Sequence, residues 1–268
     1  MSGDIKQMPF DAEALAGELF VALDNAQPPV AQFSGRYPEL TIDQAYGVSL
    51  AVLNRRLARG ERVTGKKIGL TAKAIQQALG IDEPDYGFLT DAMAVAEGAI
   101  VPIATGLRSP MVEPEIAFVL KHRLAGPGVT PEQVLAATDY VTPCFEIVDS
   151  RFDTPQIRIA DTVADNASGA AYVLGNAPID PAGIDLAAIA CRVTRNGELV
   201  QEGIGAAVMD NPLNSVAWLA NCLGRYGVAL EAGDVVLPGS MTPFIPVRSG
   251  DRFVADMGAL GQVSVNFD

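Results

Sequence analysis

The sequence predicts an α+β protein that forms one structural unit, with a helical N-terminal region over residues 1–95 packed on a β-rich region over residues 96–268. Apolar residues recur at helical spacing through the first part of the chain. From about residue 98, short β-branched runs alternate with Gly, Pro and Asn-Gly, which is typical of a largely antiparallel sheet. No repeat, low-complexity tract or linker separates the two regions, so we expect them to share a core.

Three helices are predicted in the N-terminal region. The first covers residues 11–26, where Asp11 is suited to cap the helix and leucines recur every fourth residue. The second covers residues 41–60, because Thr41 and Gln44 form a capping-box pattern and a glycine closes the segment. A shorter helix with the same threonine start and glycine end is predicted over residues 71–80.

The β-rich region contains one clear hairpin and two helices. The hairpin covers residues 191–203, where Asn196 and Gly197 suit a tight primed turn. One helix is predicted over residues 130–140, with a threonine cap followed by proline, and the other over residues 211–227, opened by Asn-Pro. The C-terminal residues return to strands.

Composition limits the possible functions. The chain of 268 residues carries 32 acidic and 19 basic side chains, a formal net charge of -13 that would repel nucleic acid and anionic lipid. The three cysteines, Cys144, Cys191 and Cys222, lack metal-type spacing, and the first residues lack a secretory pattern. No apolar run approaches the ~20 residues that span a bilayer. We expect a cytoplasmic protein with no nucleic-acid or membrane partner.

Two glutamates stand at the start of an apolar run, in the segment "VEPEIAFVL". Because side chains alternate along a strand, Glu113 and Glu115 face the same side. Pro114 lacks a ladder donor, which predicts that this pair lies at a strand start or at a sheet edge. A second apolar segment, "TPCFEIVDSRF", carries another acid, Glu146, in surroundings that we expect to be partly buried.

Carboxylates gathered in a low-dielectric place repel one another unless a cation intervenes. With no imidazole or thiolate nearby in the sequence, oxygen ligation favours Mg²⁺ or Mn²⁺ over Zn²⁺. The alternative is that the glutamates form a solvated face that guards a sheet edge against aggregation. Spacing alone does not decide between the two.

Other polar residues are candidates on weaker grounds. Lys66 and Lys67 precede an apolar "IGL", so one lysine points inward if the segment is a strand, although both stems are long enough to reach solvent. Glu83 and Asp85 lie in "DEPDYG", a turn by composition. The only histidine, His122, follows a strand end and is expected at the surface, so a histidine-carboxylate pair for activating water is lacking.

A further polar cluster, Asp165, Asn166 and Ser168, precedes an apolar run and is expected to form a hydrogen-bonded loop. The glycine-containing turns match neither a P-loop nor a dinucleotide fingerprint. No nucleotide site is predicted.

Taken together, these segments resemble the 2-keto-4-pentenoate hydratase and 4-oxalocrotonate decarboxylase branch of the fumarylacetoacetate hydrolase superfamily. The resemblance runs through nearly the whole chain and rests on seven segments in order: "GKKIGLTAKAIQ", "DEPDYGFLTD", "VEPEIAFVL", "FEIVDSR", "DTVADNAS", "NPLNSVAWLA" and "LEAGDVVLPGS". It implies a mixed β roll or sandwich of the fumarylacetoacetate-hydrolase C-terminal type, preceded by a helical part and assembled into homo-oligomers.

The resemblance also implies the site. Its metal-binding glutamate triad matches Glu113, Glu115 and Glu146, with Mg²⁺ or Mn²⁺ as the cofactor, and its active-site lysine matches Lys67. Asp85 is the implied catalytic acid that shuttles a proton. The implied substrate-binding residues lie in three of the matched segments and are Ser168, Leu70, Gly239 and Ser240. One departure stands out, because Met111 occupies a position where a basic residue is expected in many relatives, and Arg108 is the nearest basic residue before it.

The implied activity is hydration of 2-hydroxypenta-2,4-dienoate to 4-hydroxy-2-oxopentanoate in the breakdown of aromatic rings. A 4-oxalocrotonate decarboxylase is the alternative, because it uses the same chelate to release CO₂ from a 2-oxo-hexenedioate. A non-catalytic partner subunit of such an enzyme is a third possibility. Association with a related decarboxylase or with the downstream aldolase is also expected from the resemblance.

Overall fold

The structure is a computed structural model that describes residues 10–23, 27–73, 76, 81, 83–104, 106–154 and 156–268. Three helices open the chain: α1 (Ala12–Ala22), α2 (Phe33–Arg36) and α3 (Ile42–Ala58). The Asp11 carboxylate accepts a hydrogen bond from Ala14 N, and the predicted capping box of Thr41 and Gln44 is formed. The predicted starts of the first two long helices are therefore confirmed, whereas the predicted helix over residues 71–80 lies mostly outside the described residues.

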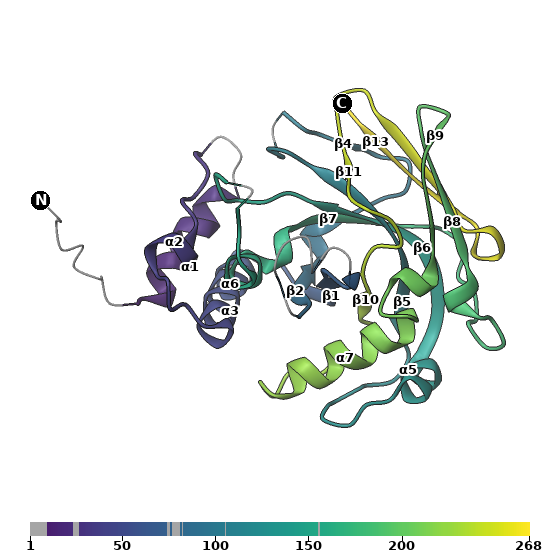
Figure 1. The fold of residues 1–268 in the computed structure, drawn as a ribbon, viewed down its shortest axis with the longest axis horizontal. Coiled ribbons are helices and arrows are strands. Elements are labelled where there is room, and N and C mark those ends of the chain that lie inside the picture. Colours follow the sequence, from purple (N-terminus) through teal and green to yellow (C-terminus); the bar gives the residue numbers. More distant parts are fainter. Residues whose placement is uncertain are drawn as a thin grey trace, which may run out of the picture.

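Two sheets form the rest of the molecule (Figure 1). The larger sheet has the order β2-β1-β10-β5-β6-β7-β3, with β11 paired to β5. Its strands, in chain order, are β1 (Val63–Gly69), β2 (Asp85–Thr90), β3 (Ala94–Val95), β5 (Met111–Leu120), β6 (Thr138–Val148), β7 (Gly169–Leu174), β10 (Val235–Leu237) and β11 (Ile245–Pro246).

The smaller sheet has the order β4-β13-β12-β8-β9. Its strands, in chain order, are β4 (Ile100–Val101), β8 (Ala190–Arg195), β9 (Glu198–Ile204), β12 (Arg252–Asp256) and β13 (Gln262–Phe267). The predicted hairpin is the β8–β9 pair, and Asn196 and Gly197 in its turn have positive φ angles of 54° and 89°. Most neighbouring strands are antiparallel, as the sequence predicts, but β1–β10, β3–β7 and β4–β13 are parallel.

Among the described residues, three further helices and five 3-10 turns connect the strands. The helices are α5 (Pro131–Ala137), α6 (Ile159–Ala164) and α7 (Pro212–Gly224). The 3-10 turns are η1 (Asp91–Met93), η2 (Asn166–Ser168), η3 (Leu186–Ala188), η4 (Gly205–Ala207) and η5 (Gly258–Leu260). The predicted caps of α5 and α7 are present, since Thr130 accepts from Gln133 N and Asn211 accepts from Leu213 N. α6 ends just before the loop predicted around Asp165, Asn166 and Ser168, and no helix was predicted there.

The helical reading of residues 1–95 is wrong for its last third, because β1 and β2 lie there as strands of the larger sheet. The reason is tertiary. β1 pairs in parallel with β10, which follows it by about 170 residues in the chain, so no local pattern reports the pairing. Gly65 permits this contact, because a Cβ at that position would lie 1.9 Å from Val235 O.

The position of Pro114 also differs from the prediction. It lies inside β5, which is a central strand, and pairs with Phe145 of β6. On the other side of β5, β11 pairs up to Val112 and β10 begins at Phe118, so Pro114 lies in the gap between two short partners. Its carbonyl accepts a hydrogen bond from Met241 N in this gap. The proline therefore fits a locally unpaired stretch and not a sheet edge.

The two faces of β6 have different roles. Phe145 packs edge-on against Phe253 of the smaller sheet, with ring centroids 6.4 Å apart, so this face belongs to the main core. Glu146 points to the opposite face, because neighbouring residues on a strand alternate. That face continues into a small apolar cluster that includes Ala117, Cys144 and Leu237. The sheet thus carries acids and a separate apolar cluster on the side away from the smaller sheet.

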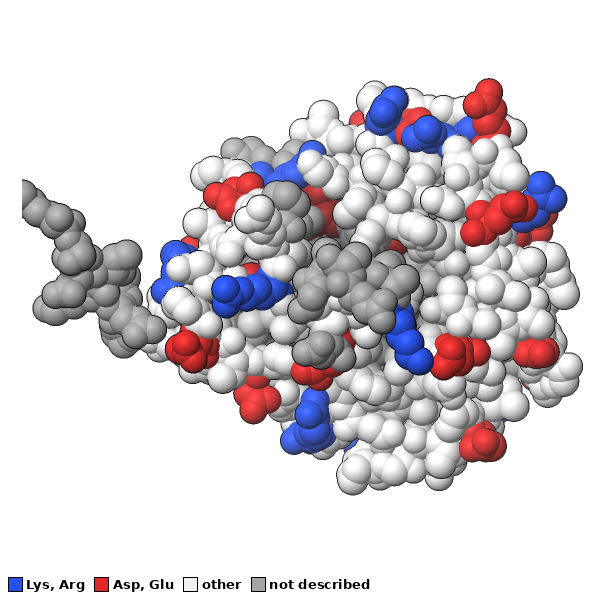
Figure 2. Space-filling model, viewed as in Figure 1, with Lys and Arg blue, Asp and Glu red and all other residues white. Residues whose placement is uncertain are grey.

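The charged surface agrees with the sequence analysis. On the face drawn in Figure 2, acidic side chains are interspersed among the lysines and arginines. Among the described residues, no helix combines the length and the hydropathy that are needed to cross a membrane.

We predict opposite effects for alanine at two glycines. Gly65→Ala should lower the free energy of unfolding by about 3 kcal/mol or more, because its Cβ would clash with the β10 backbone. Gly47→Ala is the matched control, because Gly47 lies inside α3 with no other atom within 4 Å of an added Cβ. It should raise stability by about 0.5–1 kcal/mol. Urea denaturation measures both, and equal stability of the two variants would contradict the β1–β10 packing.

Candidate metal centre and active site

Three glutamates converge on the face of the larger sheet that points away from the smaller one. Glu113 on β5 lies directly opposite Glu146 on β6, and Glu115 lies two residues further along the same face of β5. One carboxylate oxygen from each residue lies within 4.8 Å of the others. The three residues are 6%, 0% and 1% exposed, respectively. The solvated edge guard that the sequence left open is therefore wrong.

Burial makes the charged form of this cluster costly. It raises the pKa of Glu113 to about 8 and the pKa of Glu115 well above its usual range, and repulsion from Glu146 adds to both shifts. Burial also raises the pKa of Glu146, although the Lys67 ammonium opposes that shift. Three carboxylates and one ammonium leave the cluster with an excess of negative charge when all are ionised.

The donor atoms of the cluster fit a hard divalent cation. Glu115 Oε1 and both oxygens of Glu146 are buried and have no hydrogen-bond donor among the described residues, while Glu115 Oε2 accepts from Gly239 N at 2.9 Å. Oxygen atoms from three carboxylates are the ligands that Mg²⁺ and Mn²⁺ prefer. The residues present therefore fit the metal that the sequence predicts.

Lys67 lies beside the glutamates at the centre of β1. It is 1% exposed, its Nζ lies 3.1 Å from Glu146 Oε1, and it donates a hydrogen bond of 2.8 Å to Ala167 O. The contact with Glu146 is an ion pair without the alignment of a hydrogen bond. Burial alone lowers the pKa of Lys67, but the surrounding carboxylates outweigh it and the net shift is upward, so the lysine stays a cation.

The neighbouring Lys66 lies on the other face of β1 and has a different partner. Its side chain points away from Lys67 along the alternating strand, and its Nζ pairs with Asp234 at 2.5 Å. Both lysines are buried, whereas the sequence required only one of them to point inward. Lys66 thus holds β1 to the segment before β10, and Lys67 is the lysine of the site.

Asp85 completes the charged groups around Lys67. It begins β2 opposite Gly69, and a Cβ at Gly69 would lie 2.5 Å from Asp85 Oδ1 and 3.3 Å from Lys67 Nζ. The aspartate is 4% exposed, and its Oδ1 has no hydrogen-bond donor among the described residues. Burial raises the pKa of Asp85, and Lys67 partly offsets that shift. The residue therefore has the environment of a proton carrier.

A cavity of about 660 Å³ opens above this cluster. Five of the predicted site residues line it: Lys67, Leu70, Asp85, Glu113 and Ser168. Gly239 and Ser240 lie elsewhere. The Gly239 N–H binds Glu115, whereas the Ser240 hydroxyl donates to Thr242 O at 2.8 Å and accepts from Thr242 N. Gly239 therefore positions a glutamate, and Ser240 closes its own turn.

The loop before β7 presents two groups to the site in a strained conformation. Asn166, Ala167 and Ser168 have positive φ angles of 55°, 48° and 55°, which are rare for residues with a side chain. Ala167 supplies the carbonyl that binds Lys67, and Ser168 lines the cavity. Asn166 fixes the loop to β2, because its amide accepts from Phe88 N and donates to Phe88 O.

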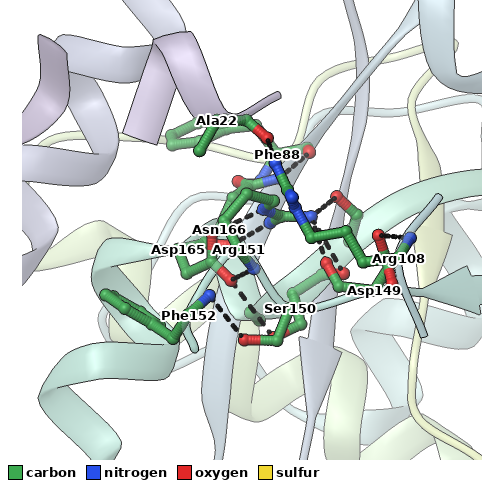
Figure 3. Close-up of polar contacts among 12 residues, drawn as sticks. Ala22, Phe88, Arg108, Asp149, Ser150, Arg151, Phe152, Asp165 and Asn166 are labelled. Atoms are coloured by element: carbon green, nitrogen blue, oxygen red, sulfur yellow. Dashed lines mark hydrogen bonds and ion pairs between the residues drawn. The ribbon is translucent and has the colours of Figure 1, made fainter. Parts of the chain in front are cut away.

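A buried arginine, which the sequence reasoning missed, organises this loop (Figure 3). Arg151 Nε donates to Asp165 Oδ1 at 2.6 Å, and both of its other nitrogens donate to backbone carbonyls, among them Asp149 O and Asp165 O. Asp149 in turn accepts from the backbone N–H groups of Arg108 and Ser109. The segment "FEIVDSR" contained both residues, but only the fold shows that they join β6 to the loop.

Two further residues that the sequence singled out can now be placed. The Arg108 side chain donates to Ala22 O at the end of α1, and Arg108 also contributes to the cavity wall. His122 is exposed beyond the far end of β5, as predicted. Met111 lines the cavity at the near end of that strand.

We predict that the metal-free protein loses stability as the pH rises. Between the usual glutamate pKa of 4.5 and the value of about 8, the folded protein retains a proton on Glu113 that the unfolded chain has released. This contribution is fully present below the lower value and is lost as the pH rises through the upper one. Thermal denaturation in EDTA from pH 5 to pH 9 measures the trend.

Glu113→Gln should flatten that pH dependence, whereas Glu231→Gln should retain it, because the Glu231 side chain is 55% exposed in a surface ion pair. A melting temperature that is independent of pH in the unaltered protein would show that the cluster is solvated.

The Arg151 network gives a second prediction. Arg151→Met should cost about 3–5 kcal/mol, because it leaves the buried Asp165 carboxylate without its cation. Arg62→Met is the control, since the Arg62 side chain is 84% exposed in its ion pair with Asp91 and its loss should change stability far less. Chemical denaturation compares the variants, and similar losses for both would rule out an organising role for Arg151.

Comparison with known proteins agrees with this site. Residues 63–267 match the family described as fumarylacetoacetate (FAA) hydrolase C-terminal. The chain is 48% identical to a 2-hydroxyhexa-2,4-dienoate hydratase of Comamonas testosteroni, over 95% of this chain and 97% of that protein. It is 41% identical to a 2-keto-4-pentenoate hydratase of Paraburkholderia xenovorans, over 97% of this chain and 96% of the relative.

A solved structure resembles it over almost the same length. This is the 4-oxalocrotonate decarboxylase of Pseudomonas putida G7 complexed with magnesium and adipate, with a TM-score of 0.92, 36% identity and coverage of 96% of this chain and 97% of that one. The matched region contains both strands of the glutamate cluster and the strand of Lys67. The chain belongs to the fumarylacetoacetate hydrolase family.

Proposed function

We propose that the protein is a metal-dependent hydratase that adds water to 2-hydroxypenta-2,4-dienoate or a close homologue and gives 4-hydroxy-2-oxopentanoate or its homologue. The observation that carries this proposal is the cluster of three buried glutamates beside Lys67 at the base of the cavity. Hydratases of such dienoates, 41–48% identical over nearly the whole chain, support the choice of reaction.

Glu113, Glu115 and Glu146 would hold Mg²⁺ or Mn²⁺. The bound cation would act as a Lewis acid toward the carboxylate and the C2 oxygen of the substrate. The similar decarboxylase structure, which is complexed with magnesium, supports a divalent ion.

Lys67 would stabilise negative charge that develops on the C2 oxygen during ketonisation. Its ammonium is held between Glu146 and Ala167 O and is kept protonated by the surrounding acids, so it supplies a fixed positive charge in a dry site. Ketonisation places a proton on C5 and gives an enone that is electrophilic at C4. Water then adds at C4 and a second proton is placed on C3.

Asp85 is our candidate for the group that carries these protons, because burial raises its pKa and it lines the cavity beside Lys67. Ser168 and Leu70 would contact the substrate from the cavity wall. Gly239 would act through Glu115, and the geometry gives Ser240 a role in its own turn.

A 4-oxalocrotonate decarboxylase is the second candidate, favoured by the high structural similarity to the decarboxylase of Pseudomonas putida G7. The triad does not separate the two reactions, because the cation that it would hold would supply the same Lewis-acid chemistry to both substrates. A non-catalytic partner subunit is disfavoured, since the triad and Lys67 are brought together in one buried cluster. We further propose a homo-oligomer in the cytoplasm, with a related decarboxylase or the downstream aldolase as possible associates.

The function is tested by the mass of the product formed from freshly generated 2-hydroxypenta-2,4-dienoate with Mg²⁺. A gain of one water that EDTA abolishes is the expected result. Lys67→Met should lower kcat by about 10²-fold or more, because it removes the charge that faces the developing oxyanion. Lys121→Met, an exposed lysine after β5, is the matched control and should leave the rate unchanged. Unaltered hydration by folded Lys67→Met protein would remove Lys67 from the mechanism.

A further inference from the structure

Along the β5–β6 ladder, the cavity wall changes from acidic to apolar side chains. On the face that carries the glutamates, three successive pairs of opposed residues are Glu115 with Cys144, Glu113 with Glu146, and Met111 with Val148. Successive pairs on one face are about 7 Å apart. The apolar cluster around Cys144 closes the first end, so the cavity extends from the acidic pair toward the Met111–Val148 pair.

Beyond the acidic pair, the cavity is lined mainly by apolar side chains. Besides Met111 and Val148, these are Phe152, Ile157 and Phe244. Phe152 is itself fixed, because it packs edge-on against Phe33 of α2 with ring centroids 5.1 Å apart. A volume of about 660 Å³ is within the range of sites for drug-sized ligands, so a five-carbon acid would occupy only part of it.

The charges on this part of the wall oppose a second anion. Asp149 and Asp153 line the cavity together with Arg108, whose guanidinium donates to Ala22 O, so two carboxylates and one cation belong to this part of the lining. Lys67, the other cation of the lining, is engaged by Glu146 and Ala167 O at the base. The sequence places no lysine or arginine at the internal positions outside the described residues, which are 24–26, 74–75, 77–80, 82, 105 and 155.

We infer that the end of the substrate remote from its carboxylate is an uncharged alkyl group that packs against Met111, Val148 and Phe244, and that the site discriminates against dienoates with a second carboxylate at that end. This inference rests on the proposed function and deepens it. It favours the hydratase over the decarboxylase, whose substrate is a dicarboxylate. A carboxylate at the apolar end would lose its hydration beside Asp149 and Asp153, which outnumber the one cation of that part of the lining, Arg108.

Two stable ligands of equal chain length test the inference by binding alone. 2-Oxohexanoate ends in a methyl group and 2-oxohexanedioate ends in a carboxylate, so calorimetric titration of the Mg²⁺-loaded protein isolates the effect of the end group. 2-Oxohexanoate should bind at least about tenfold more tightly, because the burial of an unpaired charge is costly. Equal or tighter binding of 2-oxohexanedioate would overturn the inference.

Substitutions of Met111 test whether this residue causes the preference for 2-oxohexanoate. Met111→Lys should reduce the preference for 2-oxohexanoate at least about tenfold by supplying a cation at the apolar end, whereas Met111→Leu should retain the preference. Leu199→Lys on β9 controls for the added charge, because Leu199 is 47% exposed on the smaller sheet. An undiminished preference in folded Met111→Lys protein would overturn the assignment of Met111.

Turnover separates this inference from the proposed function. 2-Hydroxyhexa-2,4-dienoate should be hydrated with a higher kcat/KM than 2-hydroxypenta-2,4-dienoate, by about threefold or more for its extra methyl group. A protein that binds 2-oxohexanoate selectively but hydrates neither dienoate would refute the proposed function and leave the inference standing. Hydration of both dienoates by a protein that binds 2-oxohexanoate and 2-oxohexanedioate equally would refute the inference and leave the proposed function standing.

Discussion

The burial of three carboxylates on one face of a sheet is the constraint on which the rest of the structure depends. The three residues are Glu113, Glu115 and Glu146. One carboxylate oxygen from each lies within 4.8 Å of the others, and all three side chains are buried. Burial and mutual repulsion both oppose their ionisation, and Lys67 offsets only part of the cost. A divalent cation removes the remaining conflict, and its binding is therefore coupled to the ionisation of the glutamates.

The surrounding elements serve to hold these groups together. The β5–β6 register places Glu113 opposite Glu146, and the parallel pairing of β1 with β10 brings Lys67 beside them. The loop before β7 supplies the carbonyl that orients Lys67, and it keeps its strained backbone because Arg151 binds Asp165 and the adjacent carbonyls. The ion pair of Arg151 with Asp165, neither of which is among the residues that line the cavity, thus maintains the geometry of the site.

Local chemistry in the sequence predicted the parts of the fold that depend on neighbours along the chain. The caps at Asp11, Thr41, Thr130 and Asn211 and the turn at Asn196 are all formed as expected, because each uses hydrogen bonds or backbone angles within a few residues. The assignment of residues 63–69 and 85–90 to a helical region failed because long-range pairing determines those strands.

Some residues of the candidate site were predicted from the sequence and others were not. Strand alternation predicted that Glu113 and Glu115 share a face, and the residues alone offered Glu146 and one of two lysines as candidates. The resemblance assigned Glu146 to the triad and selected Lys67, and the structure brings these residues together. Arg151 was missed because one arginine in a loop gives no sequence signal until its partner Asp165 is known. Ser240 stays a predicted substrate contact, and its hydroxyl also bonds to Thr242 within one turn, a contact that composition cannot reveal.

The measurement that tests the central claim most directly is a titration of the metal-free protein with Mn²⁺, followed by electron paramagnetic resonance of the free ion. The account predicts one tight site per chain, which is lost in Glu146→Gln protein that remains folded. Binding that is absent from the unaltered protein, or that survives unchanged in Glu146→Gln, would contradict a metal centre formed by the three buried glutamates.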